Sequence, residues 1–290
     1  MRFFLFTIFL FISIVSFSQL NFLEGTWQGL KINLGEPNTK GKAIWFDFKI
    51  NSETKNVIGN ARIESPFTED YALKVIKGKV ISKNVIEFED VMFGNKKNSG
   101  SKYWCLLKGK LIYDEVTGYL IGDFISTDCR SNVGKITLYR SKYKMSVADT
   151  VSQYHSWVNN FVNDLSRGWK AFYVREAEMR NFEFKPVYFE HDKDILKEEF
   201  YKFLQQMVNI VKSHTDLRIK IIGHTDSNGS DEYNVNLSKR RADNIKSYLI
   251  ALGIKIDKIE IEFRGEYDPA VSNSTTEGKK LNRRVDFEFI

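Results

Sequence analysis

Two short segments, Gly223-His224-Thr225-Asp226 and Asn234-Val-Asn-Leu-Ser-Lys-Arg-Arg-Ala242, determine the predicted fold of the C-terminal part of this chain. The first follows a predicted strand, Leu217–Ile222, in which apolar and basic residues alternate. The second lies on a predicted helix whose apolar residues recur at spacings of three and four. Arg241 interrupts this apolar stripe, and a guanidinium is rarely buried among leucines unless an anion meets it. The pattern predicts that Asp226 and Arg241 either pair with each other or jointly hold a ligand that carries both charges.

The region around these segments, residues 183–290, has the pattern of an α/β domain. The predicted order is β-α-β-α-β-β, with a short turn of helix at Thr276–Leu281 before the last strand. Connections of helical length favour parallel pairing of successive strands, so we expect a mixed sheet with helices on one face. The other predicted elements are the strands Lys185–Phe189, Ile259–Phe263 and Val285–Phe289 and the helix Asp194–Ser213.

Residues 185–290 contain a set of short segments at a characteristic spacing. These are Val187-Tyr-Phe-Glu-His-Asp-Lys193, Gly223-His-Thr-Asp-Ser-Asn-Gly229, Tyr233-Asn234, Leu237-Ser238, Arg241-Ala242, Gly253-Ile254, Gly265-Glu266, Pro269, Asn273, Glu277-Gly278 and Asn282-Arg-Arg-Val285. In these segments the region resembles the OmpA-like peptidoglycan-binding domain of Gram-negative cell envelopes. The resemblance implies non-covalent binding of the peptidoglycan stem peptide. The ligand would be the free end of meso-diaminopimelate, which presents an ammonium and a carboxylate on one carbon.

The resemblance also implies the residues of the ligand site. Asp226 would accept hydrogen bonds from the ammonium, and Arg241 would bind the carboxylate, which suits the planar guanidinium. Asn234 would contact the ligand or its loop, or else cap the helix. Asp192 matches a position that lines the pocket, and Arg283 is the better candidate of the Arg283-Arg284 pair to reach the site. Arg284 is interpreted as a structural salt-bridge residue.

The C-terminal region lacks a catalytic pattern. It contains no serine–histidine–acid order and no paired acid–base arrangement beside the site. His224 precedes Asp226 at the end of the strand and is interpreted as structural. We therefore expect a binding protein rather than an enzyme, with no catalytic residue, no metal and no cofactor.

Residues 19–145 have the pattern of an all-β domain. Apolar residues alternate with polar ones along several short segments, and no helix is predicted between them. Such a succession predicts a closed antiparallel barrel or a sandwich. Charged residues on the strand faces argue against a membrane-spanning barrel. The predicted strands are Thr26–Ile32, Ile44–Ile50, Val57–Ile63, Tyr71–Ile76, Val85–Phe88, Tyr103–Tyr113, Tyr119–Ile125 and Lys135–Tyr139.

The β domain opens with Gly25-Thr26-Trp27 and closes with Leu138-Tyr139-Arg140. These two segments resemble the first and last strands of lipocalin-like (calycin) barrels. In that family the tryptophan and the arginine pack across the closed end of the barrel. The resemblance leaves two alternatives open, a barrel that encloses a small apolar ligand and a barrel filled by its own core. Cys105 and Cys129 either form a disulfide or remain free buried thiols, and no histidine accompanies them at metal-ligand spacing.

Residues 146–182 are predicted to be a helical linker. Val151, Tyr154, Trp157, Val158 and Phe161 recur at helical spacing. The aromatic side chains of this segment either pack on one of the domains or form a docking surface for a partner.

The N-terminus and the overall charge indicate the compartment. Met1-Arg2 precedes an apolar run from Phe3 to Phe17, so residues 1–18 read as a signal peptide rather than a membrane anchor. The formal charge of +6 is spread along the chain, which makes nucleic-acid binding a weak interpretation.

Together these features predict a periplasmic, wall-bound protein of a Gram-negative cell without a transmembrane span in the mature chain, and they leave association with the outer membrane open. It would bind peptidoglycan and anchor an envelope protein partner through its N-terminal domain or linker. The alternative is an envelope carrier of small ligands, or an enzyme, whose activity lies in the β domain.

Overall fold

The computed structural model describes residues 22–66, 68–100, 103–145 and 157–290. The predicted signal peptide and the first part of the predicted linker, including Val151 and Tyr154, lie outside the described residues. Contacts divide the chain into two compact units, Met1–Val174 and Arg175–Ile290, which we call the barrel unit and the C-terminal unit. Within the described ranges, no helix combines the length and apolarity needed to cross a membrane.

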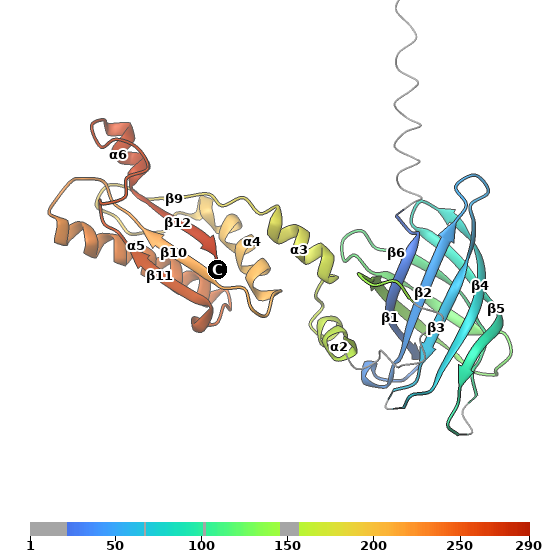
Figure 1. The fold of residues 1–290 in the computed structure, drawn as a ribbon. Coiled ribbons are helices and arrows are strands. Elements are labelled where there is room, and N and C mark those ends of the chain that lie inside the picture. The colour runs from blue at the N-terminus through green and yellow to red at the C-terminus, as the bar shows by residue number, and fades with distance from the viewer. Residues whose placement is uncertain (1–21, 67, 101–102, 146–156) are drawn as a thin grey trace, which may run out of the picture. The chain divides into compact units, whose positions relative to one another are not determined.

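The barrel unit is a closed antiparallel barrel of eight strands (Figure 1). Each strand pairs with the next along the chain, and β1 closes the barrel by pairing with β8. The structure therefore selects the barrel over the sandwich. The strands are β1 (Gly25–Asn33), β2 (Lys42–Ile50), β3 (Asn56–Glu64), β4 (Tyr71–Ser82), β5 (Val85–Lys97), β6 (Leu107–Tyr113), β7 (Leu120–Ser126) and β8 (Val133–Arg140), with a 3-10 turn at Asn38–Lys40.

Apolar side chains from alternate strand positions fill the interior of the barrel, as the period of two predicts. Trp27 is fully buried there, and its Nε1 donates to the Leu23 carbonyl at 3.0 Å. The guanidinium of Arg140 lies 5.2 Å from the centre of the Trp27 ring. This is the contact that the calycin resemblance implies, while the family resemblance itself stays a prediction.

Three strand boundaries of the barrel differ by more than two residues from the prediction: the end of β4, which lies at Ser82 rather than Ile76, the start of β6 and the end of β5. The strand predicted from Tyr103 begins only at Leu107, because Leu106 bonds to the β7–β8 turn: its N–H donates to Asp128 Oδ1 at 2.8 Å and its carbonyl accepts from Thr127 N at 3.0 Å. Cys105 is held to the same turn by a disulfide with Cys129. Strand β5 runs past its predicted end to Lys97, because register shifts preserve its pairing with β4 while breaking the alternation in the sequence.

The helical segment after the barrel contains α2 (Val158–Ser166) and α3 (Phe172–Arg180). Val158 and Phe161 of α2 pack with Leu30 and Trp45, which face outward from the barrel wall. The Trp157 ring lies 5.5 Å from the Trp45 ring in an edge-on arrangement. In the described part of the segment these aromatic side chains pack on a domain, the first of the two predicted alternatives.

The C-terminal unit is a four-stranded mixed sheet in the order β11-β10-β12-β9 (Figure 1). Strands β10 and β11 are parallel, as predicted for successive strands. Strand β9 does not pair with β10, because β12 lies between them and is antiparallel to both. The elements are β9 (Val187–Tyr188), a 3-10 turn (Glu198–Phe200), α4 (Tyr201–Lys212), β10 (Ile219–Gly223), α5 (Asp231–Ala251), a 3-10 turn (Ile256–Lys258), β11 (Ile259–Phe263), α6 (Thr276–Asn282) and β12 (Arg284–Phe289).

One face of this sheet is apolar and the other is charged. Buried residues of α4 and α5, such as Val208 and Ile245, form one core with the inner residues of the strands, such as Ile221. On the opposite face Lys220 pairs with Glu262 at 2.7 Å and with Glu288 at 3.5 Å. The helices α4 and α5 therefore cover the apolar face, as predicted.

Helix α4 begins at Tyr201, seven residues after its predicted start. The residues before it are tied to α5 instead: Asn244 Nδ2 donates to the Asp194 carbonyl at 2.8 Å, and Arg240 Nε donates to the Asp194 carboxylate at 3.1 Å. Asp192 has a φ of 57°, in the left-handed region, which also prevents a helix from starting there.

Candidate functional site

The candidate site lies where four segments of the C-terminal unit meet. These are the end of β10, the helix α5, the loop after β9, and the junction of α6 with β12. Gly223 allows β10 and α5 to approach closely, since a Cβ at this position would lie 2.2 Å from the Ser238 carbonyl oxygen. Any larger residue at position 223 would push α5 away and separate the side chains of the site.

Asp226 is a nearly buried carboxylate, with 3% of its surface exposed. Its Oδ2 accepts from Arg283 Nη1 at 2.8 Å, and its Oδ1 accepts from the Asn228 N–H at 3.2 Å. His191 Nδ1 lies 3.9 Å from the same Oδ2 and is largely exposed. Arg283 is therefore the ion-pair partner of Asp226, while its predicted contact with a ligand stays a prediction.

Arg241 is fully buried and donates to three backbone carbonyls. Its Nε donates to Lys193 O at 2.9 Å, its Nη1 to His224 O at 2.9 Å and its Nη2 to Glu190 O at 3.2 Å. Burial lowers the pKa of Arg241 to about 10, and the nearby carboxylate of Asp226 opposes this change. The predicted direct bridge between Asp226 and Arg241 is therefore wrong for this state, because Arg241 is occupied by carbonyls and Asp226 by Arg283.

Asn234 and Asp192 lie at the N-terminal end of α5. Asn234 Nδ2 donates to Glu266 Oε2 at 2.5 Å, while its buried Oδ1 has no hydrogen-bond partner among the described residues. The helix cap is Ser230, whose side chain accepts from Tyr233 N at 3.3 Å, so the capping alternative for Asn234 is wrong. Asp192 is exposed and accepts a hydrogen bond from the Tyr233 hydroxyl.

His224 and Arg284 have structural contacts, as the sequence predicts. Arg284 Nε donates to the Asp286 carboxylate at 2.8 Å. His224 is 1% exposed, and its Nε2 lies 3.5 Å from Asp286 Oδ2. Burial, and then the neighbouring charge of Arg284, lower the pKa of His224 to about 4. The imidazole is therefore neutral and buried at neutral pH.

The sequence did not reveal every group that shapes this site. The carbonyls of Glu190 and Lys193 fix Arg241, but a backbone carbonyl leaves no mark on the residue type. Tyr233 and Glu266 bond to Asp192 and Asn234, respectively. Both belong to segments quoted for the family resemblance, and this was the available signal for them.

This domain combines a mixed sheet, helices on one face of the sheet, and a site formed by an acid and arginines near the strand ends. Residues 188–283 match the family model described as the OmpA family. The C-terminal unit is therefore an OmpA-like domain.

Three relatives illustrate this similarity. The chain is 39% identical over 104 residues to "Outer membrane protein A" of Bordetella avium, covering 36% of this chain and 54% of that protein. It is 37% identical over 101 residues to "Peptidoglycan-binding protein ArfA" of Mycobacterium tuberculosis, covering 35% of this chain and 31% of the relative. It is 33% identical over 101 residues to "Peptidoglycan-associated lipoprotein" of Legionella pneumophila, covering 35% and 57%. The chain thus spans between about a third and just over half of the length of these relatives. The similarity concerns one domain.

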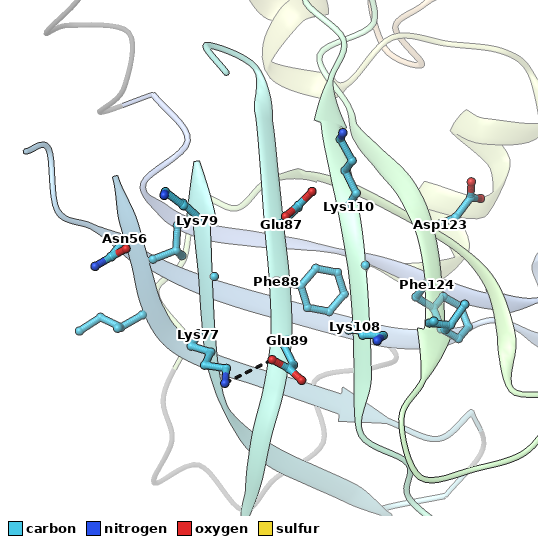
Figure 2. A pocket seen from close by; sticks show the side chains of 15 residues that line it. Asn56, Lys77, Lys79, Glu87, Phe88, Glu89, Lys108, Lys110, Asp123 and Phe124 are labelled. Carbon is cyan, nitrogen blue, oxygen red and sulfur yellow. Dashed lines mark ion pairs between the residues drawn. The ribbon is translucent and has the colours of Figure 1, made fainter. Parts of the chain in front are cut away.

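The barrel unit carries a hollow of about 780 Å³ across strands β3 to β7 (Figure 2). Exposed charged side chains line it, and among them Lys77 and Glu89 form an ion pair at 3.3 Å. Between them runs a row of inward residues, including Phe88 and Phe124, whose rings belong to the apolar core. This alternation of charges across neighbouring strands is typical of a solvated sheet face.

Three aromatic residues of the barrel, Trp27, Trp45 and Tyr103, lie in different surroundings. Trp27 is part of the packed core, Trp45 faces outward under α2, and Tyr103 is 76% exposed. The three aromatic residues therefore do not line a common cavity.

Proposed function

We propose that this protein binds peptidoglycan through its OmpA-like domain and thereby anchors an envelope component to the cell wall. Two of the similar proteins are described as peptidoglycan-binding or peptidoglycan-associated, which supports this function. The proposal is carried by the nearly buried carboxylate of Asp226. This carboxylate pairs with the Arg283 guanidinium at 2.8 Å and interacts electrostatically with the buried guanidinium of Arg241. A buried acid with two arginines nearby suits a ligand that carries an ammonium and a carboxylate on one carbon.

The proposed ligand is the free end of meso-diaminopimelate in the stem peptide. Its ammonium would bind Asp226, and its carboxylate would bind Arg283, whose side chain is 12% exposed. Arg241 has five N–H donors, of which three are bound to carbonyls, so two remain for the same carboxylate. The ligand would reach Arg241 only if the loop that carries Glu190 and Lys193 shifts.

Co-sedimentation with purified peptidoglycan tests this proposal. Asp226→Asn keeps the size of the side chain and removes its charge, so we expect at least a tenfold loss of binding, as for a charge-assisted hydrogen bond. Arg283→Met should weaken binding similarly. Asp257→Asn, at an exposed residue of the same unit, is the matched control and should bind like the original chain.

The comparison of two wall types tests the proposed ligand. Peptidoglycan with lysine in place of diaminopimelate lacks the carboxylate on the terminal carbon and should be retained poorly. Undiminished binding by Asp226→Asn and Arg283→Met would exclude this site, and equal binding of both wall types would exclude diaminopimelate as its ligand.

We further propose that the protein acts in the periplasm as a binding protein and not as an enzyme. The relatives are described as outer membrane or peptidoglycan-associated proteins, which supports an envelope location. The barrel unit would supply the contact with the anchored component, whether directly or through the helical segment.

A further inference from the structure

One end of the barrel has a charged interior, in contrast to the apolar remainder. At this end β1 finishes and β2 begins, and the inward positions change from apolar residues to lysines and an aspartate. We call this group the mouth cluster, and it consists of Lys31, Lys42, Lys74, Asp90 and Trp104. Lys31, Lys74 and Asp90 are at most 4% exposed, whereas Lys42 is half-buried and connects the cluster to solvent.

The mouth cluster contains more positive than negative charge. Lys74 Nζ is paired with Asp90 Oδ2 at 2.5 Å, and this is the only carboxylate within the cluster. Lys31 lies directly opposite Lys42 in the register of β1 and β2, an arrangement that is destabilising for like charges. The carboxylates of Glu36 and Asp128 act on the cluster electrostatically, but both are exposed.

Lys31 is held by neutral groups. Its ammonium donates to Asn33 Oδ1 at 2.5 Å and to Asn132 Oδ1 at 3.0 Å, and it lies 4.2 Å from the centre of the Phe124 ring. Burial, and then the charges of Lys42 and Lys74, lower the pKa of Lys31 to about 7. Among the described residues, no carboxylate forms an ion pair with Lys31, since Asp90 pairs with Lys74. Burying an ammonium in this way costs free energy unless an anion compensates its charge.

Two polar atoms of the mouth cluster lack hydrogen-bond partners among the described residues. Asp90 Oδ1 is a buried acceptor, while its Oδ2 also accepts from the Leu107 N–H at 2.8 Å. Trp104 Nε1 is a buried donor, and the Trp104 ring lies 5.1 Å from Lys42 Nζ. Buried polar groups are almost always paired, so an unpaired donor and an unpaired acceptor in one cluster indicate a ligand that offers both functions.

The rest of the barrel interior limits the size of this ligand. Next to the mouth cluster the interior positions are apolar: Phe46, Phe88 and Phe124 belong to one buried cluster, and the rings of Phe46 and Phe88 lie 4.9 Å apart. We propose that the mouth cluster binds a small protonated oxyanion, such as monohydrogen phosphate. Its oxygens accept from the lysines and from Trp104 Nε1, and its O–H donates to Asp90 Oδ1. This site is separate from the wall-binding function and does not depend on it.

Thermal unfolding of the full chain in different salts tests the proposal. Phosphate should raise the unfolding midpoint of the barrel unit with a saturable dependence on concentration. Chloride at equal ionic strength should not, and sulfate should be weaker, because it has no O–H for Asp90 at neutral pH. Lys31→Met should weaken phosphate binding about tenfold or more, while its midpoint without phosphate should equal or exceed that of the original chain.

Lys79→Met is the matched control, because Lys79 is an exposed lysine on the same strand as Lys74. It should keep the full response to phosphate. Isothermal titration of the unsubstituted chain with phosphate provides a second measurement that does not depend on the folding of any variant. Absence of phosphate binding in that titration, an equal effect of chloride or sulfate, or a full response in Lys31→Met would each overturn the proposal.

Discussion

At the scale of single residues, a fully buried guanidinium has to use its N–H donors inside the protein, and Arg241 uses them on backbone carbonyls. Each of these bonds joins α5 to a neighbouring loop, so the residue organises the site even without a ligand. Removing it would leave the buried His224 carbonyl without this donor, at a cost of about 1–3 kcal/mol, and would also release the carbonyls of Glu190 and Lys193. Substitutions at Arg241 would therefore alter folding and binding together, whereas Asp226→Asn and Arg283→Met are cleaner probes.

The sequence identified the residue types of this site but not all of their partners. Arg241 was recognisable because a charge interrupts an apolar stripe, and Asp226 because it follows a strand. Their partners were not, because the acceptors of Arg241 are backbone carbonyls and the partner of Asp226 lies 57 residues away. Pairing over such distances depends on the tertiary fold, which periodicity does not encode.

The buried imidazole of His224 predicts a pH dependence of stability. Its pKa in the folded protein is about 4, below the ordinary value of 6.5, so the unfolded chain binds the extra proton between these values. This contribution to stability is complete above pH 6.5 and is lost as the pH falls toward 4, with a total of about 3 kcal/mol. Urea unfolding of the full chain across this range measures the loss, if the C-terminal unit is followed by the part of the far-UV circular dichroism change that does not accompany the change in tryptophan fluorescence.

His224→Gln is the control for that measurement. The glutamine does not titrate, so the free energy of unfolding should fall less steeply with decreasing pH in this variant than in the original chain. Parallel curves for the two proteins would show that other groups account for the acid sensitivity.

At the scale of secondary-structure elements, sequence periodicity predicted which elements exist but not always where they end. The inward and outward alternation gave eight strands for the barrel, as observed. It failed where pairing continues through bulges, as in β5, and where side chains tie a segment to a distant element, as before α4. The sequence pattern also did not predict that β12 lies between β9 and β10. Strand order depends on how all the strands pair in the folded sheet, and the pattern of a single strand does not encode it.

The disulfide between Cys105 and Cys129 makes a prediction about the connections at the barrel mouth. It joins the segment before β6 to the turn after β7 across a sequence separation of 24 residues. Closing a loop of that length stabilises a protein by about 3 kcal/mol in the chain-entropy description. Reduction should therefore lower the unfolding midpoint of the barrel unit, as measured by tryptophan fluorescence.

A double variant, Cys105→Ser with Cys129→Ser, is the control for reduction. It should show the same lowered midpoint, and it should not respond further to a reducing agent. An unchanged midpoint after complete reduction would mean that the mouth is held by its other contacts, such as the bond from Lys74 Nζ to the Cys105 carbonyl at 2.6 Å.

At the scale of the whole molecule, the apolar clusters of the described residues fall into two groups that share no residue, one in each unit. One fills the barrel and is extended on its outer wall by α2, and the other lies between the sheet and the helices of the C-terminal unit. Each unit is within the usual size of an independently folding domain. Separate cores permit separate unfolding, since loss of one leaves the apolar contacts of the other intact.

The separate cores predict two unfolding transitions, and the distribution of tryptophan allows them to be assigned. All five tryptophans of the chain precede Arg175, so tryptophan fluorescence reports only on the barrel unit, while far-UV circular dichroism reports on both units. We expect the two probes to give transitions that do not coincide in a urea titration. A fragment of residues 175–290 should fold alone, reproduce the second transition and retain the peptidoglycan binding proposed for the full chain. Coincident transitions, together with an unfolded fragment, would show that the two units form one cooperative structure.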